Sequence, residues 1–392
     1  MTELNTKSAC TSNRINSLAT NHTSNSDDQI MKRRTFLHAG LGTLTAGAAI
    51  SAGYIGASGT PVACEPPLPE NRPDTVYYPS HIQGMKSIGV SRPGKKGETT
   101  TRPKYKCALL YSSPHRFWTV TGNEREKVSV KKTDSIHLMV AVWYVRTGTP
   151  LSDTNPTVHI SRDGEAKETV TLWPMLSQNM GFHAGDNIPL SGEGQYSITV
   201  DVTPPQKNAT APHKPNFGNK RRFDFEFVYR TRKLSEIAST GPKSKSIQPG
   251  AANPTKMNHV PITYAPKWQN LPGKVVHDFT TGDAAFVVSL LENKQGKGES
   301  TYLAVSARTP YNRYVLPGMS LTAQGIRDGN VLFNESLSTT VSPNLSYHYG
   351  RNIKEIKSED TIEITIDAPP QIARHEGYET AFFNMQPERF VV

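Results

Sequence analysis

The sequence predicts an all-β protein in which two related β-sandwich domains are joined by a linker. Glycine and proline each occur 29 times among the 392 residues, which favours a chain with many turns over a helical bundle. Several segments alternate apolar and polar residues, and three segments of the first half recur in the second half. A chain of this length can bury two separate hydrophobic cores.

The N-terminal region predicts export. Residues 31–39 read "MKRRTFLHA", with twin arginines at Arg33 and Arg34, and a Gly/Ala-rich, weakly apolar run follows. This pattern is typical of a twin-arginine signal. The run is too rich in glycine and too poor in Leu and Ile for a membrane anchor. We therefore assign residues 1–63 to the signal and its polar n-region, with Met31 as an alternative start.

Three cysteines occur, at no zinc-ribbon or thioredoxin spacing: Cys10, Cys64 and Cys107. Cys64 ends the stretch "TPVAC" and precedes a polar, Pro-rich segment, an arrangement that resembles a lipoprotein cleavage site. Two interpretations stand equal. Cys64 is lipidated and residues 64–77 form a tether, or it is an exposed cysteine in a spacer.

The net charge of +10 does not indicate nucleic-acid binding, because Lys and Arg are spread along the chain and interleaved with Asp and Glu. No recognition helix, zinc finger or ribonucleoprotein-type aromatic motif accompanies them. The charge indicates a solvated surface, which an anionic cell surface would attract. The chain also has no nucleophile elbow, HExxH motif or phosphate loop, and Cys107 lacks the closely following His and Met of a blue-copper site. We expect no enzymatic activity.

Strands are predicted wherever apolar residues recur at every second position. This pattern marks half-buried strands, and it occurs in "QYSITVDV" (195–202), "RFDFEFVYR" (222–230) and "DTIEITID" (360–367). Residues 234–272 are rich in Ser, Pro, Lys and Gly and show no such period, so they are expected to form the linker.

The two halves of the chain repeat each other at a constant separation of 165 positions. "LMVAV" at 138 matches "LAVSA" at 303, "RDGE" at 162 matches "RDGN" at 327, and "FHAGDNI" at 182 matches "YHYGRNI" at 347. His183 therefore corresponds to His348. We interpret residues 78–233 and 273–392 as duplicated copies of one sandwich, with these two histidines at equivalent turns on the rim.

Three segments resemble the periplasmic iron-transport protein family, in its twin-arginine-exported archaeal type with a second related domain. They are "LWPMLSQNMGFHAGDNI" (172–188), "GQYSITVDVTPP" (194–205) and "RFDFEFVYR" (222–230), and the resemblance covers about residues 78–232. It implies immunoglobulin-like sandwiches that bind a copper or iron ion and act beside an iron permease in the membrane. It also allows a homodimer. The implied location is extracytoplasmic and membrane-anchored, in a periplasm or at a cell surface.

The resemblance also implies a set of metal ligands: His137, Met175, His183 and His213. Met139 stands where the family has a glutamate. A thioether suits Cu(I), whereas imidazole suits Cu(II) and Fe(II), so a mixed site tolerates a redox-active metal. Without the resemblance, the residues alone favour another interpretation, in which Met175 fills the core, His137 faces solvent and His183 hydrogen-bonds a turn.

The second copy lacks two of these ligands, because Thr340 stands at the position of Met175 and Tyr302 at that of His137. A second metal site would use His348, His375 and Met319. The alternative, which the missing ligands favour, is a degenerate copy retained for packing or for docking a partner.

Taken together, the sequence predicts an exported, membrane-tethered, copper- or iron-binding accessory protein of a high-affinity iron uptake system. The alternative is a structural or adhesive cell-surface sandwich without metal. Glycosylation sequons at Asn208, Asn334 and Asn344 suit either exposed role.

Overall fold

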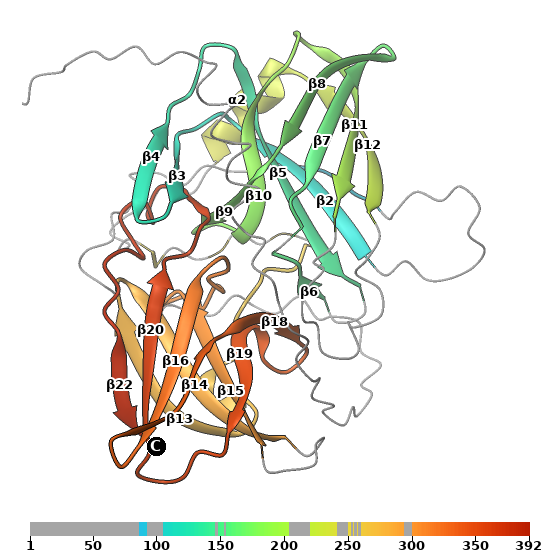
Figure 1. The fold of residues 1–392 in the computed structure, drawn as a ribbon. Helices are drawn as coiled ribbons and strands as arrows, with labels where there is room; N and C mark the ends of the chain where they lie inside the picture. Colours follow the sequence, from blue (N-terminus) through green and yellow to red (C-terminus); the bar gives the residue numbers. More distant parts are fainter. Residues whose placement is uncertain are drawn as a thin grey trace, which may run out of the picture. The chain divides into compact units, whose positions relative to one another are not determined.

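The computed structural model describes residues 86–91, 105–145, 148–152, 154–203, 220–240, 250–251, 254, 257, 260–293 and 300–392. Strands dominate this part of the chain (Figure 1), and the prediction of an all-β fold is confirmed. The helical elements among the described residues are one α-helix, α2 (Thr231–Thr240), and one turn of 3-10 helix, η1 (Trp268–Asn270).

The first sandwich consists of two sheets. Sheet 1 has nine strands in the order β1-β2-β5-β10-β9-β21-β3-β4, with β6 beside β5. Its strands are β1 (Lys86–Ser91), β2 (Tyr105–Ser112), β3 (Phe117–Thr121), β4 (Glu124–Val128), β5 (Asp134–Tyr144), β6 (Thr149–Pro150), β9 (Trp173–Ser177), β10 (Gly181–Pro189) and β21 (Ala373–Arg374). Sheet 2 has the order β12-β11-β7-β8, with β7 (Thr157–Arg162), β8 (Glu165–Thr171), β11 (Gly194–Val202) and β12 (Arg221–Tyr229).

The second sandwich also consists of two sheets. Sheet 3 has the order β13-β14-β15-β19-β18, with β13 (Lys274–Thr281), β14 (Ala284–Asn293), β15 (Ser300–Arg308), β18 (Ser338–Ser342) and β19 (Ser346–Lys354). Sheet 4 has the order β17-β16-β20-β22, with β16 (Ser320–Arg327), β17 (Asn330–Ser336), β20 (Thr361–Ala368) and β22 (Glu388–Val391).

The two sandwiches share one topology. The strand order β1-β2-β5-β10-β9 in sheet 1 corresponds to the strand order β13-β14-β15-β19-β18 in sheet 3. In the other pair of sheets, β8-β7-β11-β12 is matched by β17-β16-β20-β22. Alternation along the strands explains the layers, since every second side chain of β11 and β12, among them Ile198, Val200 and Phe225, belongs to the core between sheets 1 and 2.

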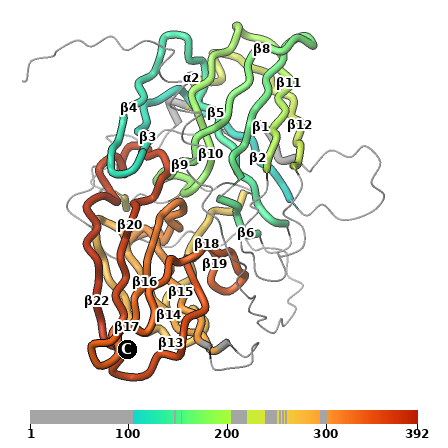
Figure 2. The backbone as a smooth tube through the Cα atoms, in the orientation of Figure 1, coloured from blue at the N-terminus to red at the C-terminus, as the bar shows by residue number. Residues whose placement is uncertain are grey.

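One strand from the second half of the chain belongs to a sheet of the first sandwich. β21 follows β20 in the chain, yet it pairs in parallel with β9 and antiparallel with β3 in sheet 1. The backbone trace in Figure 2 shows this segment of the C-terminal third beside β9 and β3. The second half of the chain therefore contributes residues to the first sandwich.

Part of the segment expected to be a linker is ordered and packed. Helix α2 lies within residues 231–240, and Ile237 is buried in the core of the first sandwich. Further on, the backbone of Ala265 donates to the carbonyl of Arg313, and Tyr264 forms an isolated bridge with Tyr314.

Several expectations fall on residues outside the described part of the chain. These are the export signal, the tether with Cys64, and His213. Within the described residues, no helix combines the length and the apolar character that crossing a membrane requires.

A buried tyrosine anchors the start of β11. Tyr196 is 1% exposed, and its hydroxyl donates a 2.6 Å hydrogen bond to the carbonyl of Gly192, four residues earlier in the chain. Immunoglobulin-like sandwiches use the same device, a tyrosine corner, to fix the turn that leads into a central strand.

We expect Tyr196→Phe to lower the free energy of unfolding by about 1 kcal/mol, because it removes one hydrogen bond and leaves a carbonyl unpaired. Urea unfolding of the full chain measures this change. Tyr229→Phe in the adjacent β12 is the control, since the Tyr229 hydroxyl donates no hydrogen bond within the described residues. Equal effects of the two substitutions would contradict the assignment.

Candidate metal centre

The candidate centre lies on the face of sheet 1 that points away from sheet 2. Along β5, Leu138 and Val140 belong to the core shared with sheet 2, so alternation places His137 on the opposite face. In β10 the same rule places Ala184 in the core and Gly185 on the opposite face. Both faces of these strands are nevertheless buried, which is unusual for an antiparallel sheet with only one partner sheet.

His137 is held in one orientation. Its side chain is fully buried, and its Nδ1 lies 2.9 Å from the Oδ1 of Asn187, which is its register partner on β10. The amide oxygen accepts the Nδ1 proton, so the lone pair of this imidazole lies on Nε2. That Nε2 is buried and has no hydrogen-bond partner among the described residues.

His183 shows the same arrangement two residues before Gly185. Its Nδ1 lies 3.1 Å from the carbonyl oxygen of Gly181, and its Nε2 is buried without a partner in the described part of the chain. A histidine that donates one ring N–H to a carbonyl oxygen and presents the other nitrogen unpaired has the geometry of a metal ligand. His183 pairs in register with Met175 on β9.

Gly185 provides the space in which these side chains meet. A Cβ atom at Gly185 would lie 3.0 Å from the Nε2 of His137 and 3.2 Å from the Sδ of Met175. Any side chain here would fill the volume between the nitrogen and the sulfur. The glycine is therefore explained by the close approach of the two ligand atoms and of the Leu138 carbonyl oxygen, 3.0 Å from such a Cβ, and not by a turn.

Two further histidines complete the group. His115 follows β2, and His375 follows β21. The Nε2 of His115 lies 2.9 Å from the Nδ1 of His375. Ring nitrogens of His115, His137 and His375 all lie within 4.8 Å of one another, and the ring of His183 is 5.1 Å from that of His375.

Asn187 connects the residues of this group. Besides accepting from His137, it donates through Nδ2 to the carbonyl of His115 at 3.0 Å, and its Oδ1 also accepts from the backbone N–H of His115. One amide thus orients a histidine side chain and fixes the backbone of another. The imidazole of His115 is itself held by a 2.9 Å contact between Nδ1 and the carbonyl of Ser113.

Burial keeps these imidazoles neutral. It lowers the pKa of His183 to about 4, and it lowers the pKa values of His137 and His375 well below the usual value, with their histidine neighbours acting in the same direction. The pKa of His115 is lowered by burial as well. Neutral imidazole is the form that binds metals, so the group is ready to ligate at neutral pH.

The group contains no carboxylate among the described residues. Met139, at the position where the resembling family has a glutamate, is 3% exposed and packs in a hydrophobic cluster with Leu110, Trp143 and Met180. Glu376 is adjacent to His375 but forms an ion pair with Arg116. Three imidazole Nε2 atoms, those of His137, His183 and His375, and the Met175 thioether are available as ligands, because the Nε2 of His115 accepts from the Nδ1 of His375. The expected copper or iron ion suits this set.

The structure brings together three of the four ligands expected in the first domain, His137, Met175 and His183, whereas His213 lies outside the described residues. The expectation that His183 stands at a rim turn is wrong. His183 is 1% exposed and lies within strand β10, which continues through Gly185 and Asn187.

The proposed second site does not form from the residues expected for it. His375 lies in the first centre, and Met319 packs in the core of the second sandwich. The hydroxyl of Tyr302 lies 3.0 Å from the Nε2 of His348, to which it donates its proton, and 3.4 Å from the Oγ1 of Thr340. Gly350, the counterpart of Gly185, directly faces this hydroxyl. In the second sandwich the Tyr302 phenol thus fills the space beside Gly350. In the first sandwich, the ligand atoms of His137 and Met175 border the corresponding space beside Gly185.

Sequence reasoning missed the roles of His115 and His375 at this centre. No sequence motif around His115 identifies it as a ligand. A pattern does point to His375, because it follows the paired prolines of the second copy as His213 follows those of the first. Only the pairing of β21 with β9, which places Ala373 opposite Met175, shows which centre it joins.

Comparison with protein families agrees with the division into two parts. The model of a family described as "Fe2+ transport protein" matches residues 104–230, and that of a family described as "Domain of unknown function (DUF7350)" matches residues 269–391. The resemblance to the iron-transport family is confirmed for the first of these regions. His137, Met175 and His183 lie in the first region, and His375 lies in the second.

Two solved structures of FetP from uropathogenic Escherichia coli are similar to part of the chain. One is a copper-bound variant, at 18% identity, covering 36% of this chain and 97% of that chain with a TM-score of 0.26. The other is the protein as isolated, at 18% identity, covering 35% of this chain and 96% of that chain with a TM-score of 0.24. No curated protein matches the chain.

Gly185→Ala should weaken copper binding about tenfold or more, because the added methyl group occupies the space between His137 Nε2 and Met175 Sδ. Titration calorimetry measures the affinity. Gly350→Ala is the matched control in the second sandwich, where the methyl group meets Tyr302 and should lower thermal stability without changing copper affinity. Unchanged copper binding in Gly185→Ala would place the ion elsewhere.

The second sandwich should lose stability in acid through His348. Burial lowers its pKa from 6.5 to about 4, opposed by the contact with the Ser346 carbonyl. As the pH falls below 6.5, His348 takes up a proton in the unfolded chain before it does so in the folded chain. The contribution of His348 to stability is therefore complete above pH 6.5 and falls by about 3 kcal/mol by pH 4.

Urea unfolding of the wild type and of His348→Gln, at several pH values from 7 to 4, tests this expectation. The difference in unfolding free energy between the two proteins isolates His348 from the other histidines. It should shrink as the pH falls. A difference that does not change with pH would show that His348 takes up its proton at the same pH in the folded and the unfolded chain.

Proposed function

We propose that the chain is an exported, non-enzymatic accessory protein of an iron uptake system, and that it binds a copper or iron ion in the first sandwich. This proposal rests on the observation that several possible metal-ligand atoms without hydrogen-bond partners converge on one space. The Nε2 atoms of His137 and His183 are buried without a partner among the described residues, and the Sδ of Met175 borders the same space above Gly185.

An ordinary hydrophobic core does not account for these unpaired nitrogens. A buried acceptor without a hydrogen bond costs about 1–3 kcal/mol, so native cores rarely retain several in one place. Here three such nitrogens lie in one group, those of His137, His183 and His375. A bound ion would supply the missing partner to all three.

The donor set favours a soft or borderline ion. Imidazole and thioether ligands disfavour Ca²⁺ and Mg²⁺, which bind oxygen atoms. No carboxylate of the group offsets positive charge within the described residues, so an ion of low charge is the least costly to bury. These arguments support Cu(I) first, then Cu(II) and Fe(II). With thioether and imidazole ligands together, a copper ion could change between its two oxidation states.

The cellular role is supported by the family match and the N-terminal sequence. The first sandwich matches a family described by ferrous iron transport, and one of the two FetP structures is copper-bound. Arg33 and Arg34 support export, and Cys64 supports a lipid tether to the membrane. An iron permease in that membrane is the partner that such a protein would serve.

Two substitutions separate a copper site from a packed core. Met175→Leu preserves the packing volume and removes the sulfur. It should therefore lower the affinity for Cu(I) about tenfold or more and leave the affinities for Cu(II) and Fe(II) nearly unchanged. His183→Ala should lower the affinity for all three ions. Calorimetry and competition with a Cu(I) chelator measure these affinities.

Met319→Leu is the control for methionine substitution, because Met319 packs in the core of the second sandwich. It should change none of the affinities. Copper affinity that is unchanged in both Met175→Leu and His183→Ala would reject the proposal and leave a sandwich that functions without metal.

A further inference from the structure

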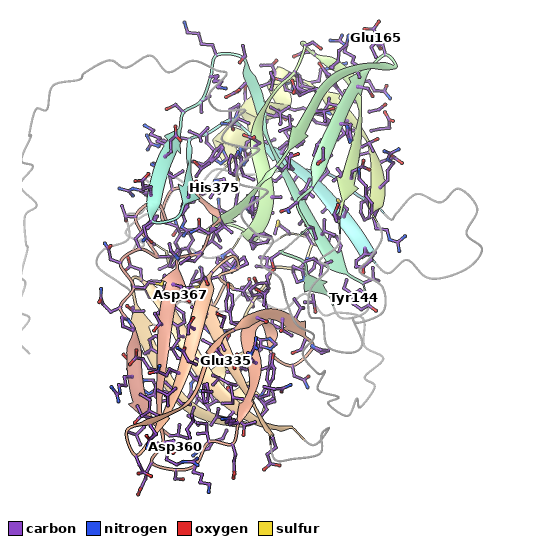
Figure 3. The ribbon with its side chains drawn as sticks, viewed as in Figure 1. Tyr144, Glu165, Glu335, Asp360, Asp367 and His375 are labelled. Carbon is purple, nitrogen blue, oxygen red and sulfur yellow. The ribbon has the colours of Figure 1, made fainter. Side chains whose placement is uncertain are left out.

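A short segment of the second half covers the candidate centre. We name residues 371–379 the strap. The strap follows β20 and includes β21, which pairs with β9 and β3 of the first sandwich. Figure 3 labels His375, the residue of the strap that enters the histidine group.

The strap is held on sheet 1 by both apolar and polar contacts. Ala373 packs with Phe117 and Met175, and Ile372 belongs to a buried cluster that includes Leu176. Gln371 accepts from the backbone N–H of Gly122 at 2.8 Å and donates to its carbonyl at 2.9 Å. The backbone N–H of His375 donates to the carbonyl of Leu176 at 3.0 Å. An exposed ion pair joins Arg116 to Glu376. Each of these polar contacts contributes modestly to the attachment.

The shape of the strap is built within the second half of the chain. Arg374 is fully buried, and it donates to the carbonyl of Ile372 at 2.6 Å and to that of Pro370 at 2.9 Å. Its guanidinium also lies 5.1 Å from the centre of the Phe382 ring. These side-chain contacts lie within the second half of the chain, whereas the backbone of Arg374 pairs with β3 and β9 of sheet 1.

The unpaired ligand nitrogens lie on both sides of this attachment. His137 and His183 belong to the first sandwich, and His375 belongs to the strap, and each has a buried Nε2 without a partner among the described residues. Attachment without an ion would remove all three nitrogens from water and leave them without a hydrogen-bond partner, which is unfavourable. An ion that binds all three makes the same attachment favourable.

We propose that the ion locks the strap onto the first sandwich, so that the strap closes when metal binds and lifts to load or release it. This gives the second domain a role, which is to control metal exchange at a centre in the first. The inference rests on the proposed metal binding. Because metal binding and attachment are linked, the metal strengthens attachment by the same factor by which attachment strengthens metal binding.

Hydrogen exchange of the full chain tests the proposal, with chelator-treated protein compared with protein carrying one equivalent of copper. Peptides from the strap should exchange about tenfold or more slowly with copper, because the His375 amide is then protected by Leu176. Peptides from β14 and β15, in the second sandwich, should exchange equally in both samples. Strap exchange that is unchanged while calorimetry shows bound copper would overturn the inference alone. A failure to bind copper at all would overturn the proposed function with it.

Two variants sharpen the test. His375→Ala retains His137, Met175 and His183, so it should still bind copper, more weakly, while strap exchange no longer responds to the metal. Gln371→Ala removes the contacts with Gly122 and no ligand, and it should weaken copper binding roughly three- to tenfold. Gln324→Ala on β16, a partly exposed glutamine of the same domain, is the matched control and should have no effect. Copper affinity in Gln371→Ala equal to that of the control would contradict the coupling.

Discussion

The register between β5 and β10 is the constraint on which the rest of the structure depends. It sets Asn187 opposite His137 and Gly185 opposite Met139, while β9 sets Met175 opposite His183. Because side chains alternate along a strand, a slip of one residue would turn the histidines into the sandwich core and the core residues into the centre. The same pairing therefore builds the hydrophobic layer on one face and the donor group on the other. Both faces must be covered, which explains why a segment from elsewhere in the chain lies against sheet 1.

The sequence allowed the fold and part of the centre to be predicted. Alternation in segments such as 195–202 identified strands, the repeated segments identified a duplication, and the resemblance brought His137, Met175 and His183 together. It did not predict that β10 continues through Gly185 and Asn187, because these residues resemble turn residues when read alone. Their actual reasons are spatial, since glycine admits ligand atoms and asparagine orients a histidine. His115 and His375 could not be joined from sequence, since they are 260 positions apart and no local pattern encodes their contact.

Comparison of the two copies shows how little separates a donor group from a filled core. Both sandwiches have the same strand order, and both have a histidine opposite β9 or β18 and a glycine two residues later. In the second copy, Tyr302 replaces His137, and its hydroxyl satisfies the Nε2 of His348. A single phenol thus provides the hydrogen bond that the first copy lacks. The fold itself does not determine metal binding, which depends on a few positions of one face.

The position of His375 in the same chain as the other donors has a consequence for assembly. A ligand supplied by a second molecule would complete the centre at a rate and to an extent that depend on protein concentration. A ligand on a covalently connected segment instead has a fixed effective concentration, set by the length and stiffness of the intervening chain. Completion of the centre is then a first-order event within one polypeptide. Such a protein would retain its affinity for metal when it is dilute.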